Sequence, residues 1–267
     1  MICKKIKLGK TDKDTKAEMI VYLQPVGGEF PNISRRPVVL ILPGGGYRMC
    51  SEREADPAAF PFLAAGYQAA VLKYTVGAAA RWPEPLEDYE AAMEYLADKA
   101  DQWHLDMSKT AVVGFSAGGH LAGYAASKAL HRPAAAVLGY AVTEGQHISW
   151  RLPGAPDVTA AVNSRTSPCF LFATRDDHTV PVRNTIRFAE ALEENGIPFE
   201  CHIYSRGVHG IATADPSVLY PADLACPRAA QWVKDCLGWL DEVMRPWSQA
   251  EAGDGSGEER KRRQKEC

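Results

Sequence analysis

The most informative stretch of the sequence is Thr110-Ala111-Val112-Val113-Gly114-Phe115-Ser116-Ala117-Gly118-Gly119-His120-Leu121-Ala122. Its first five residues are mostly apolar and β-branched and predict a buried strand, while its last residues favour a helix. A Gly-x-Ser-x-Gly motif at such a junction lets the chain turn sharply and lifts the serine hydroxyl above the end of the sheet. We therefore interpret Ser116 as a nucleophile rather than as part of a chance glycine-rich turn.

On both sides of this motif, short apolar runs alternate with longer amphipathic stretches. The runs expected as strands are 38–42, 69–74, 110–114, 135–140, 169–173 and 199–204, and the expected helices are 86–99, 182–192 and 229–243. This alternation predicts an α/β fold with a mostly parallel, doubly wound sheet flanked by helices. The stretch 143–164 is only weakly periodic and is expected to form a long loop or a short cap.

The composition changes near Ser248. Residues 248–267 contain a charge run over 258–265 and no aromatic or large aliphatic side chain that could anchor them to a core. Such a segment is expected to be a disordered, charged tail. We therefore predict one domain over 1–247 and a tail over 248–267.

The charge balance excludes several classes of partner. Thirty basic and 33 acidic residues among 267 give a net charge of −3, so no global basic field would attract nucleic acid or an anionic membrane. A small-molecule substrate is the expected partner, and the oligomeric state cannot be read from these patterns.

The pattern of cysteines and apolar residues indicates the cellular compartment in which the protein is expected. The seven cysteines are odd in number and form no Cys-x-x-Cys pair, which argues against a metal site and favours a reducing compartment. The basic start, residues 1–7, is not followed by the apolar run of a signal peptide, and no stretch reaches the roughly 20 apolar residues of a membrane span. We expect a cytoplasmic protein without metal or cofactor.

A nucleophilic serine needs a base and an acidic group that orients the base, in the chain order Ser, Asp or Glu, His. Asp177 directly follows the expected strand 169–173, 61 residues after Ser116, and His209 follows the strand 199–204 in a glycine-bounded loop. Strand ends on one side of a parallel sheet lie together, so these two residues are the favoured acid and base. Asp176 is the alternative acid, and the alternative bases are His104, His120, His131, His178 and His202.

The run Pro43-Gly44-Gly45-Gly46-Tyr47 follows the first buried strand. Consecutive glycines let backbone N–H groups approach a developing oxyanion, so Gly45 and Gly46 are expected donors, together with the N–H of Ala117 after the nucleophile. A flexible loop or a phosphate cradle is the alternative. Neither Gly-x-Gly-x-x-Gly nor a P-loop motif is present, which argues against phosphate.

Several of these motifs together resemble the acetylesterase and acetyl-xylan-esterase-like branch of the α/β-hydrolases. The resemblance covers most of the chain. The motifs that carry it are 43–47, Ser51-Glu52-Arg53-Glu54, Gly66-Tyr67, Leu72-Lys73-Tyr74, 114–122, Ser167-Pro168-Cys169-Phe170, 177–182 and His209-Gly210.

This resemblance implies an α/β-hydrolase fold and a serine carboxylesterase that cleaves small acyl groups, often acetyl esters of sugars or xylo-oligosaccharides, without a cofactor. It places the triad on Ser116, Asp177 and His209 and the oxyanion loop on Gly45 and Gly46. One departure is Pro43, which stands where lipase-type relatives have the histidine of a His-Gly-Gly-Gly loop, so another group must hold this loop.

Substrate contacts and the reaction itself stay open at this point. Tyr47, His147 and Ser149 are candidate substrate contacts, and the aromatic rings of Trp82 and Trp150 are candidates for a sugar site or for core packing. The same triad could cleave an amide, as a formamidase or a small peptidase does. A non-catalytic binding protein of this fold is a third hypothesis, although such proteins usually lack a triad member and none is missing here.

Overall fold

Eight strands form one sheet in the computed structural model, which describes residues 1–8, 17–219 and 226–245. The order across the sheet is β1-β2-β4-β3-β5-β6-β7-β8. Strand β2 pairs antiparallel with β1 and with β4, and every other pair is parallel. The strands are β1 (Ile2–Lys7), β2 (Glu18–Leu23), β3 (Arg36–Leu42), β4 (Gln68–Lys73), β5 (Leu105–Phe115), β6 (Ala135–Gly139), β7 (Cys169–Thr174) and β8 (Phe199–Tyr204).

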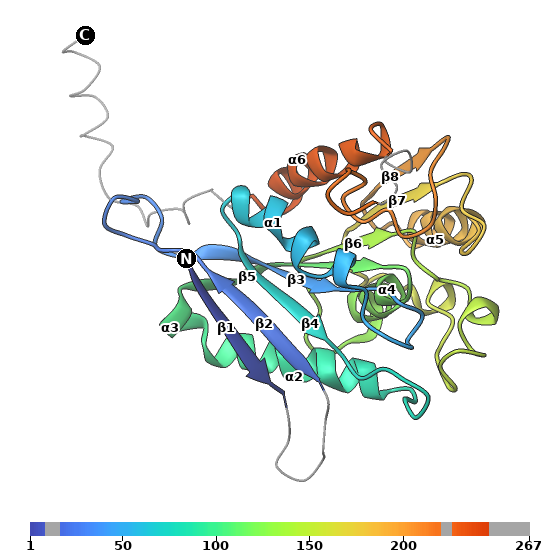
Figure 1. Cartoon of the computed structure of the whole chain (residues 1–267), viewed down its shortest axis with the longest axis horizontal. Coiled ribbons are helices and arrows are strands. Elements are labelled where there is room, and N and C mark those ends of the chain that lie inside the picture. The colour runs from blue at the N-terminus through green and yellow to red at the C-terminus, as the bar shows by residue number, and fades with distance from the viewer. Residues whose placement is uncertain (9–16, 220–225, 246–267) are drawn as a thin grey trace.

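Helices cover both faces of the sheet (Figure 1). One face packs against α2 (Glu84–Asp98), α4 (Ala117–Lys128) and α5 (Arg183–Glu194), and the other against α1 (Asp56–Ala64) and α6 (Trp232–Met244). The short α3 (Ala100–Trp103) leads into β5. This is the mostly parallel, doubly wound α/β arrangement that the sequence predicts.

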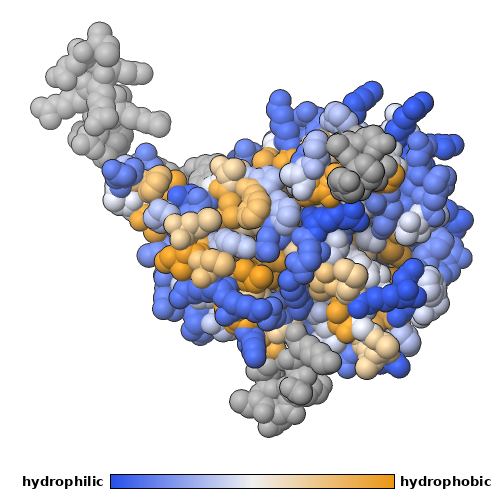
Figure 2. Space-filling view, in the orientation of Figure 1, coloured by the Kyte–Doolittle hydropathy of each residue, from blue (hydrophilic) through white to orange (hydrophobic). Residues whose placement is uncertain are grey.

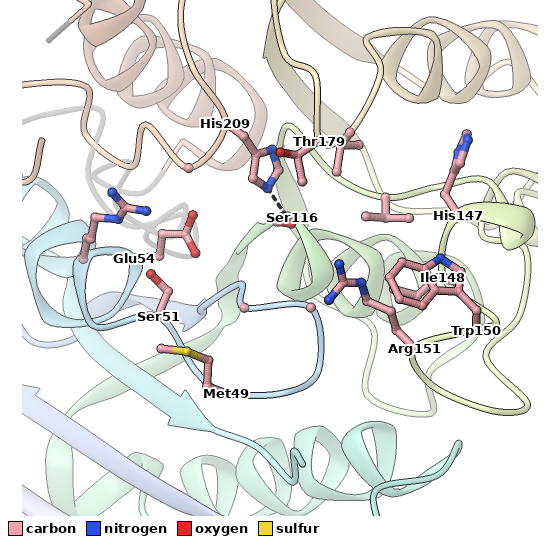
Figure 3. A pocket seen from close by; sticks show the side chains of 16 residues that line it. Met49, Ser51, Glu54, Ser116, His147, Ile148, Trp150, Arg151, Thr179 and His209 are labelled. Carbon is pink, nitrogen blue, oxygen red and sulfur yellow. Dashed lines mark hydrogen bonds between the residues drawn. The ribbon is translucent and has the colours of Figure 1, made fainter. Parts of the chain in front are cut away.

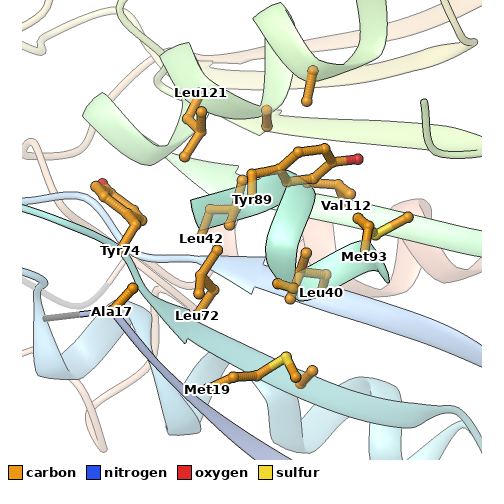
Figure 4. Close-up of a cluster of buried hydrophobic side chains, with 14 of the residues drawn as sticks. Ala17, Met19, Leu40, Leu42, Leu72, Tyr74, Tyr89, Met93, Val112 and Leu121 are labelled. Atoms are coloured by element: carbon orange, nitrogen blue, oxygen red, sulfur yellow. The ribbon is translucent and has the colours of Figure 1, made fainter. Parts of the chain in front are cut away.

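The central strands have apolar side chains on both faces because helices cover both. All seven residues of β3 are buried. Val38, Leu40 and Leu42 pack with the α2 and α4 side, where Figure 4 shows Leu40 and Leu42 beside Leu72 and Val112. Alternate residues of β3 enter the opposite layer with α1 and α6. Strands buried in this way read as continuous apolar runs, which is why the sequence identifies them.

Two strands at one edge of the sheet are absent from the sequence prediction. β1 is a lysine-rich edge strand with mostly exposed side chains, and β2 joins it to β4. A lysine-rich edge strand lacks the apolar run that marks a buried strand, and its charges disfavour pairing with another sheet edge. Helix α1 was also not predicted.

The cap and tail expectations differ in outcome. Residues 143–164 form a loop with two 3₁₀ turns, η2 (Gly145–His147) and η3 (Thr159–Ala161), in agreement with the expected loop or cap. The tail 248–267 lies outside the described residues, so the limits 1–247 stay a prediction.

The surface carries both polar and apolar side chains. Hydrophilic and hydrophobic residues are mixed on the face seen in Figure 2. Within the described ranges, no helix has the length and apolar composition needed to cross a bilayer.

Candidate active site

Ser116 occupies the sharp turn between β5 and α4. Its backbone has φ 53° and ψ −114°, a conformation that is strained for a residue with a side chain. Three hydrogen bonds hold this turn: the Ser116 N–H donates to Gly139 O at 2.9 Å, and the Ser116 carbonyl accepts from the N–H groups of His120 at 3.0 Å and Val142 at 3.1 Å. The hydroxyl is thereby fixed at the carboxyl end of the parallel strands.

The two glycines of the motif are sterically required. A Cβ on Gly114 would lie 2.2 Å from the carbonyl oxygen of Gly118. A Cβ on Gly118 would lie 2.0 Å from the carbonyl oxygen of Leu42. Both distances are far below van der Waals contact, so the close approach of β5, α4 and β3 at this turn excludes any larger residue.

Ser116, His209 and Asp177 form a continuous hydrogen-bonded chain (Figure 3 shows its first link). His209 Nε2 lies 3.0 Å from Ser116 Oγ, and His209 Nδ1 lies 2.6 Å from Asp177 Oδ2. The other carboxylate oxygen, Asp177 Oδ1, accepts the N–H groups of Thr179 at 2.8 Å and Val180 at 2.9 Å. These contacts fix the carboxylate on the ring, which is the geometry that a serine–histidine–acid relay needs.

The structure separates Asp177 from its neighbour. Asp177 is buried and faces His209, whereas Asp176 is partly exposed and lies 3.4 Å from Arg175 Nη1. The alternative His120 is fully buried in α4. Its Nδ1 lies 2.8 Å from the Tyr47 hydroxyl and its Nε2 lies 2.9 Å from the Pro156 carbonyl, so it supports the layer beneath the turn. Burial lowers the pKa of His120 to about 4.

The glycine loop after β3 lies beside the serine. Gly45 and Gly46 line the same cavity as Ser116, with φ of 121° and 63°, and a Cβ on Gly45 would lie 2.2 Å from the carbonyl oxygen of Met49. Ala117 is the first residue of α4, so its N–H has no acceptor within the helix. The glycine loop thus lies beside Ser116 in the cavity wall, and Ala117 directly follows the serine at the helix start.

A buried carboxylate, Glu54, holds the glycine loop. Its Oε2 accepts the Gly44 N–H at 2.9 Å, and its Oε1 accepts the Tyr140 hydroxyl at 2.6 Å. The Tyr140 hydroxyl in turn accepts the Ala212 N–H at 3.0 Å, and its ring packs edge-on against His209 with ring centroids 5.0 Å apart. Burial, and then the neighbouring Glu54, raise the pKa of Tyr140 well above its ordinary value. This network connects the glycine loop with the segment that carries His209.

Sequence reasoning required such a group because Pro43 has no side chain to hold the loop, but it did not identify Glu54 or Tyr140. The Tyr74 hydroxyl adds a further contact, a 2.6 Å hydrogen bond to the Pro43 carbonyl. Glu54 belongs to a stretch noted only for its resemblance to a family, and nothing local distinguishes it from the exposed Glu52 two residues earlier. Only its burial in the fold does so.

The three candidate substrate contacts have different positions. His147 lines the cavity and lies 3.4 Å from Glu144 Oε2. Tyr47, by contrast, is 1% exposed, and its ring packs among core residues beneath the loop. Ser149 is exposed and is not among the residues that line the cavity. The expectation of a substrate contact is therefore wrong for Tyr47, whose apolar surroundings bury it, and finds no support for Ser149.

The cavity above Ser116 has a volume of about 440 Å³. Residues from the cap loop form one side of it: His147, Ile148, Trp150 and Arg151. Trp82, the other candidate sugar-binding ring, packs instead against His120 and Tyr124. Among the described residues, no cluster of three or more His, Cys, Asp or Glu side chains could hold a metal ion.

Comparison with a solved structure shows which fold family this site belongs to. An α/β hydrolase enzyme called MGS-M1, from a Medee basin deep-sea metagenome library, is 38% identical and superposes with a TM-score of 0.84 over 92% of this chain and 98% of that chain. The chain belongs to the α/β-hydrolase superfamily. Within this α/β hydrolase, residues 30–141 match the family model described as BD-FAE.

Two curated relatives of the hydrolase are a xylanase and an acetylxylan esterase. Endo-1,4-beta-xylanase B from Butyrivibrio fibrisolvens is 33% identical over 214 residues, which are 68% of this chain and 33% of that protein. Acetylxylan esterase from Xylanibacter ruminicola is 30% identical over 229 residues, which are 78% of this chain and 46% of that protein. The chain spans between a third and a half of the length of these two relatives. Together the comparisons support an esterase-like α/β hydrolase of the carboxylesterase type.

Proposed function

We propose that this hydrolase is a serine carboxylesterase that removes small acyl groups, above all acetyl, from sugars such as xylo-oligosaccharides. The observation that carries the proposal is the chain Ser116–His209–Asp177, with links of 3.0 and 2.6 Å, at the floor of a cavity lined by Gly45 and Gly46. A hydroxyl, an imidazole and a carboxylate linked by hydrogen bonds beside a glycine loop support the roles of nucleophile, base, orienting acid and oxyanion donors that acyl transfer requires.

In the first half of the reaction, Ser116 Oγ attacks the ester carbonyl and His209 Nε2 takes the hydroxyl proton. The negative oxygen of the tetrahedral intermediate accepts hydrogen bonds from the N–H groups of the glycine loop, Gly45 and Gly46, and from that of Ala117. One such donor contributes roughly 3 to 4 kcal/mol to transition-state stabilisation in related cases. His209 then gives its proton to the leaving alcohol, and the acyl group stays on the serine.

In the second half, His209 removes a proton from water, and the resulting hydroxide attacks the acyl-serine carbonyl. The bond to Ser116 Oγ breaks, the serine regains the proton from His209, and the carboxylic acid leaves. Throughout, Asp177 holds the ring with Nδ1–H toward itself and stabilises the imidazolium that forms twice per cycle. No other group is needed for the proton balance.

The acetyl and carbohydrate parts of the proposal rest on the relatives rather than on the cavity. One curated relative is called an acetylxylan esterase and the other a xylanase. Both are longer than this chain, so their whole activities are not transferred to it.

Substitution of the serine tests the mechanism. We expect Ser116→Ala to lose at least about 10³-fold in kcat on p-nitrophenyl acetate, because the nucleophile is removed while binding is retained. A serine-directed phosphonate should label the wild type at Ser116 and leave the variant unlabelled. Ser149→Ala is the matched control, since that hydroxyl is exposed outside the cavity, and should keep wild-type kcat. Undiminished hydrolysis by Ser116→Ala would refute the mechanism.

A substrate panel tests the class of bond and the acyl length. We expect kcat/KM to be highest for acetyl esters, to fall from acetyl to octanoyl, and to be measurable on acetylated xylo-oligosaccharides. Faster turnover of N-formyl amides or dipeptides would instead identify the amidase that the same triad allows. Tight binding without turnover of any substrate would identify a binding protein.

A further inference from the structure

Arg151 places a guanidinium in the wall of the cavity, next to the glycine loop. Its Nη1 lies 2.9 Å from the point that a Cβ on Gly46 would occupy, so the guanidinium packs directly on the loop backbone. Figure 3 shows Arg151 and Glu54 on opposite sides of Ser116 in this view. The side chain therefore lies within the reach of a substrate bound at the serine, and no step of the proposed mechanism uses it.

This guanidinium has no acceptor in the described part of the chain: none of the ion pairs or side-chain hydrogen bonds found there involves it. By contrast, Arg183 and Arg187, which do not line the cavity, pair with the buried Glu144 at 2.9 and 3.4 Å. Burial, and then the positive charge of Arg48, lower the pKa of Arg151 below its ordinary value. A guanidinium offers five N–H donors, so a half-buried one without an acceptor favours an anionic ligand.

The neighbouring Trp150 adds an apolar surface. Trp150 is 62% exposed although tryptophan is usually buried, and the Arg151 guanidinium lies over its ring, 4.1 Å from the centroid. Both residues line the cavity. A planar guanidinium held against an aromatic ring is pre-oriented for bidentate recognition of a carboxylate, and the exposed indole provides a contact surface for the body of the same ligand.

The carboxylates near the cavity do not compete for this guanidinium. Both oxygens of Glu54 accept hydrogen bonds, from Gly44 and Tyr140, and both oxygens of Asp177 are likewise engaged. Another arginine, Arg53, also lines the cavity. An anion entering the cavity therefore meets cationic side chains, while the acidic ones are already held by donors.

From these contacts we propose that Arg151, stacked on Trp150, binds a carboxylate carried by the substrate. The inference rests on the proposed function: an acetyl group has no room for a second charged group, so the carboxylate belongs to the alcohol half of the ester. The preferred substrate is then an acetyl ester of an acidic sugar or another carboxylate-bearing alcohol. The site thus selects among acetylated alcohols by charge.

A pair of isosteric substrates tests this proposal. Wild type is assayed on 4-acetoxybenzoate and on 4-acetoxybenzamide, which differ mainly in the charge of the alcohol half, and then on acetylated glucuronic acid and acetylated glucose. We expect kcat/KM to favour each carboxylate about tenfold through KM, the size of one charge-assisted interaction. Added salt should reduce the preference.

Variants of Arg151 test whether this residue causes the preference for carboxylate substrates. Arg151→Gln should lose about tenfold on the carboxylate substrates and less than about twofold on the neutral ones, and Arg151→Lys should recover only part, because an ammonium cannot bind in bidentate fashion. The control Arg165→Gln removes an exposed positive charge outside the cavity and should keep the wild-type preference.

Two outcomes separate this proposal from the proposed function. Equal kcat/KM for charged and neutral acetyl esters in the wild type, or a preference that survives in Arg151→Gln, overturns the carboxylate site and leaves the esterase intact. Failure to hydrolyse any acetyl ester refutes the proposed function, and the carboxylate site with it.

Discussion

Replacement of Glu54 by glutamine tests how the glycine loop is held. The carboxylate accepts two hydrogen bonds, from the Gly44 N–H at 2.9 Å and from the Tyr140 hydroxyl at 2.6 Å, and it is 3% exposed. Glutamine has the same shape but only one acceptor oxygen. Its NH₂ group must face either the Gly44 N–H, which is also a donor, or Tyr140, whose hydroxyl already accepts the Ala212 N–H. Either way, one buried donor loses its acceptor.

The expected size of the effect follows from that loss. An unsatisfied buried donor costs roughly 1 to 3 kcal/mol, so the free energy of unfolding should fall by about that amount. A shift of the loop by about 1 Å would misplace the oxyanion donors, and a displacement of that size costs on the order of 100-fold in rate. We expect Glu54→Gln to lower kcat about 10- to 100-fold while KM changes by less than roughly threefold, since the donors act mainly in the transition state.

The assay is p-nitrophenyl acetate hydrolysis, with kcat and KM measured separately, together with denaturant unfolding of the same preparations. Glu52→Gln is the control, because Glu52 lies in the same 3₁₀ turn, η1 (Glu52–Glu54), but is exposed and pairs with the surface Lys73 at 2.8 Å. That variant should change stability by less than about 1 kcal/mol and leave kcat unchanged. Wild-type kcat in Glu54→Gln would refute the role assigned to the network, and a loss of stability alone would limit it to folding.

Two further predictions concern stability: alanine substitutions of two glycines should have opposite effects, and the buried His120 should make stability depend on pH. Gly118→Ala should destabilise the protein by roughly 3 kcal/mol or more and abolish activity, because the new Cβ would lie 2.0 Å from the Leu42 carbonyl oxygen. Gly238→Ala lies at an exposed site of α6 with open space around it, so it should stabilise the protein by about 0.5 to 1 kcal/mol. Urea unfolding measures both changes. Equal effects of the two would contradict the steric argument. Burial lowers the pKa of His120 from 6.5 to about 4. Between pH 6.5 and pH 4, the unfolded chain therefore binds a proton at this histidine that the folded protein does not bind. The free energy of unfolding should fall by up to about 3 kcal/mol as the pH decreases through this range. His120→Gln should flatten that dependence in unfolding measured at pH 7 and pH 4.5, and an unchanged slope would show that other groups cause it.

The sequence predicted those parts of the fold that depend on residues close together in the chain. Strands buried on both faces appear as continuous apolar runs, so β3, β4, β6 and β7 were predicted to within two residues. The opposite edge strand β8, which is only partly buried, was predicted to the residue. The elbow around Ser116 could be predicted because the need for small residues at a tight turn acts between neighbours in the chain. The edge strand β1 was not predicted, because a solvated strand has no apolar run.

The orientation of several polar side chains could not be predicted from the sequence, because it depends on groups that are distant in the chain. Sequence left Asp176 and Asp177 as alternative acids, and only the packing of the loop after β7 turns Asp177 toward a histidine 32 residues away. Tyr47 follows three glycines at the expected loop, yet its side chain enters the core and supports His120. Whether a side chain faces the cavity or the core depends on what packs against it.

The sequence by itself thus determined the central strands of the sheet, the elbow at Ser116 and the chain order of the candidate nucleophile, acid and base, because backbone propensity and apolar periodicity are properties of neighbouring residues. Only the tertiary structure decided which carboxylate orients His209, that Glu54 holds the glycine loop, and that the Arg151 guanidinium faces the cavity without an acceptor. The physical reason is that hydrogen bonding and burial of polar groups are set by contacts between segments 10 to 93 residues apart, such as Gly44 with Glu54 and Ser116 with His209.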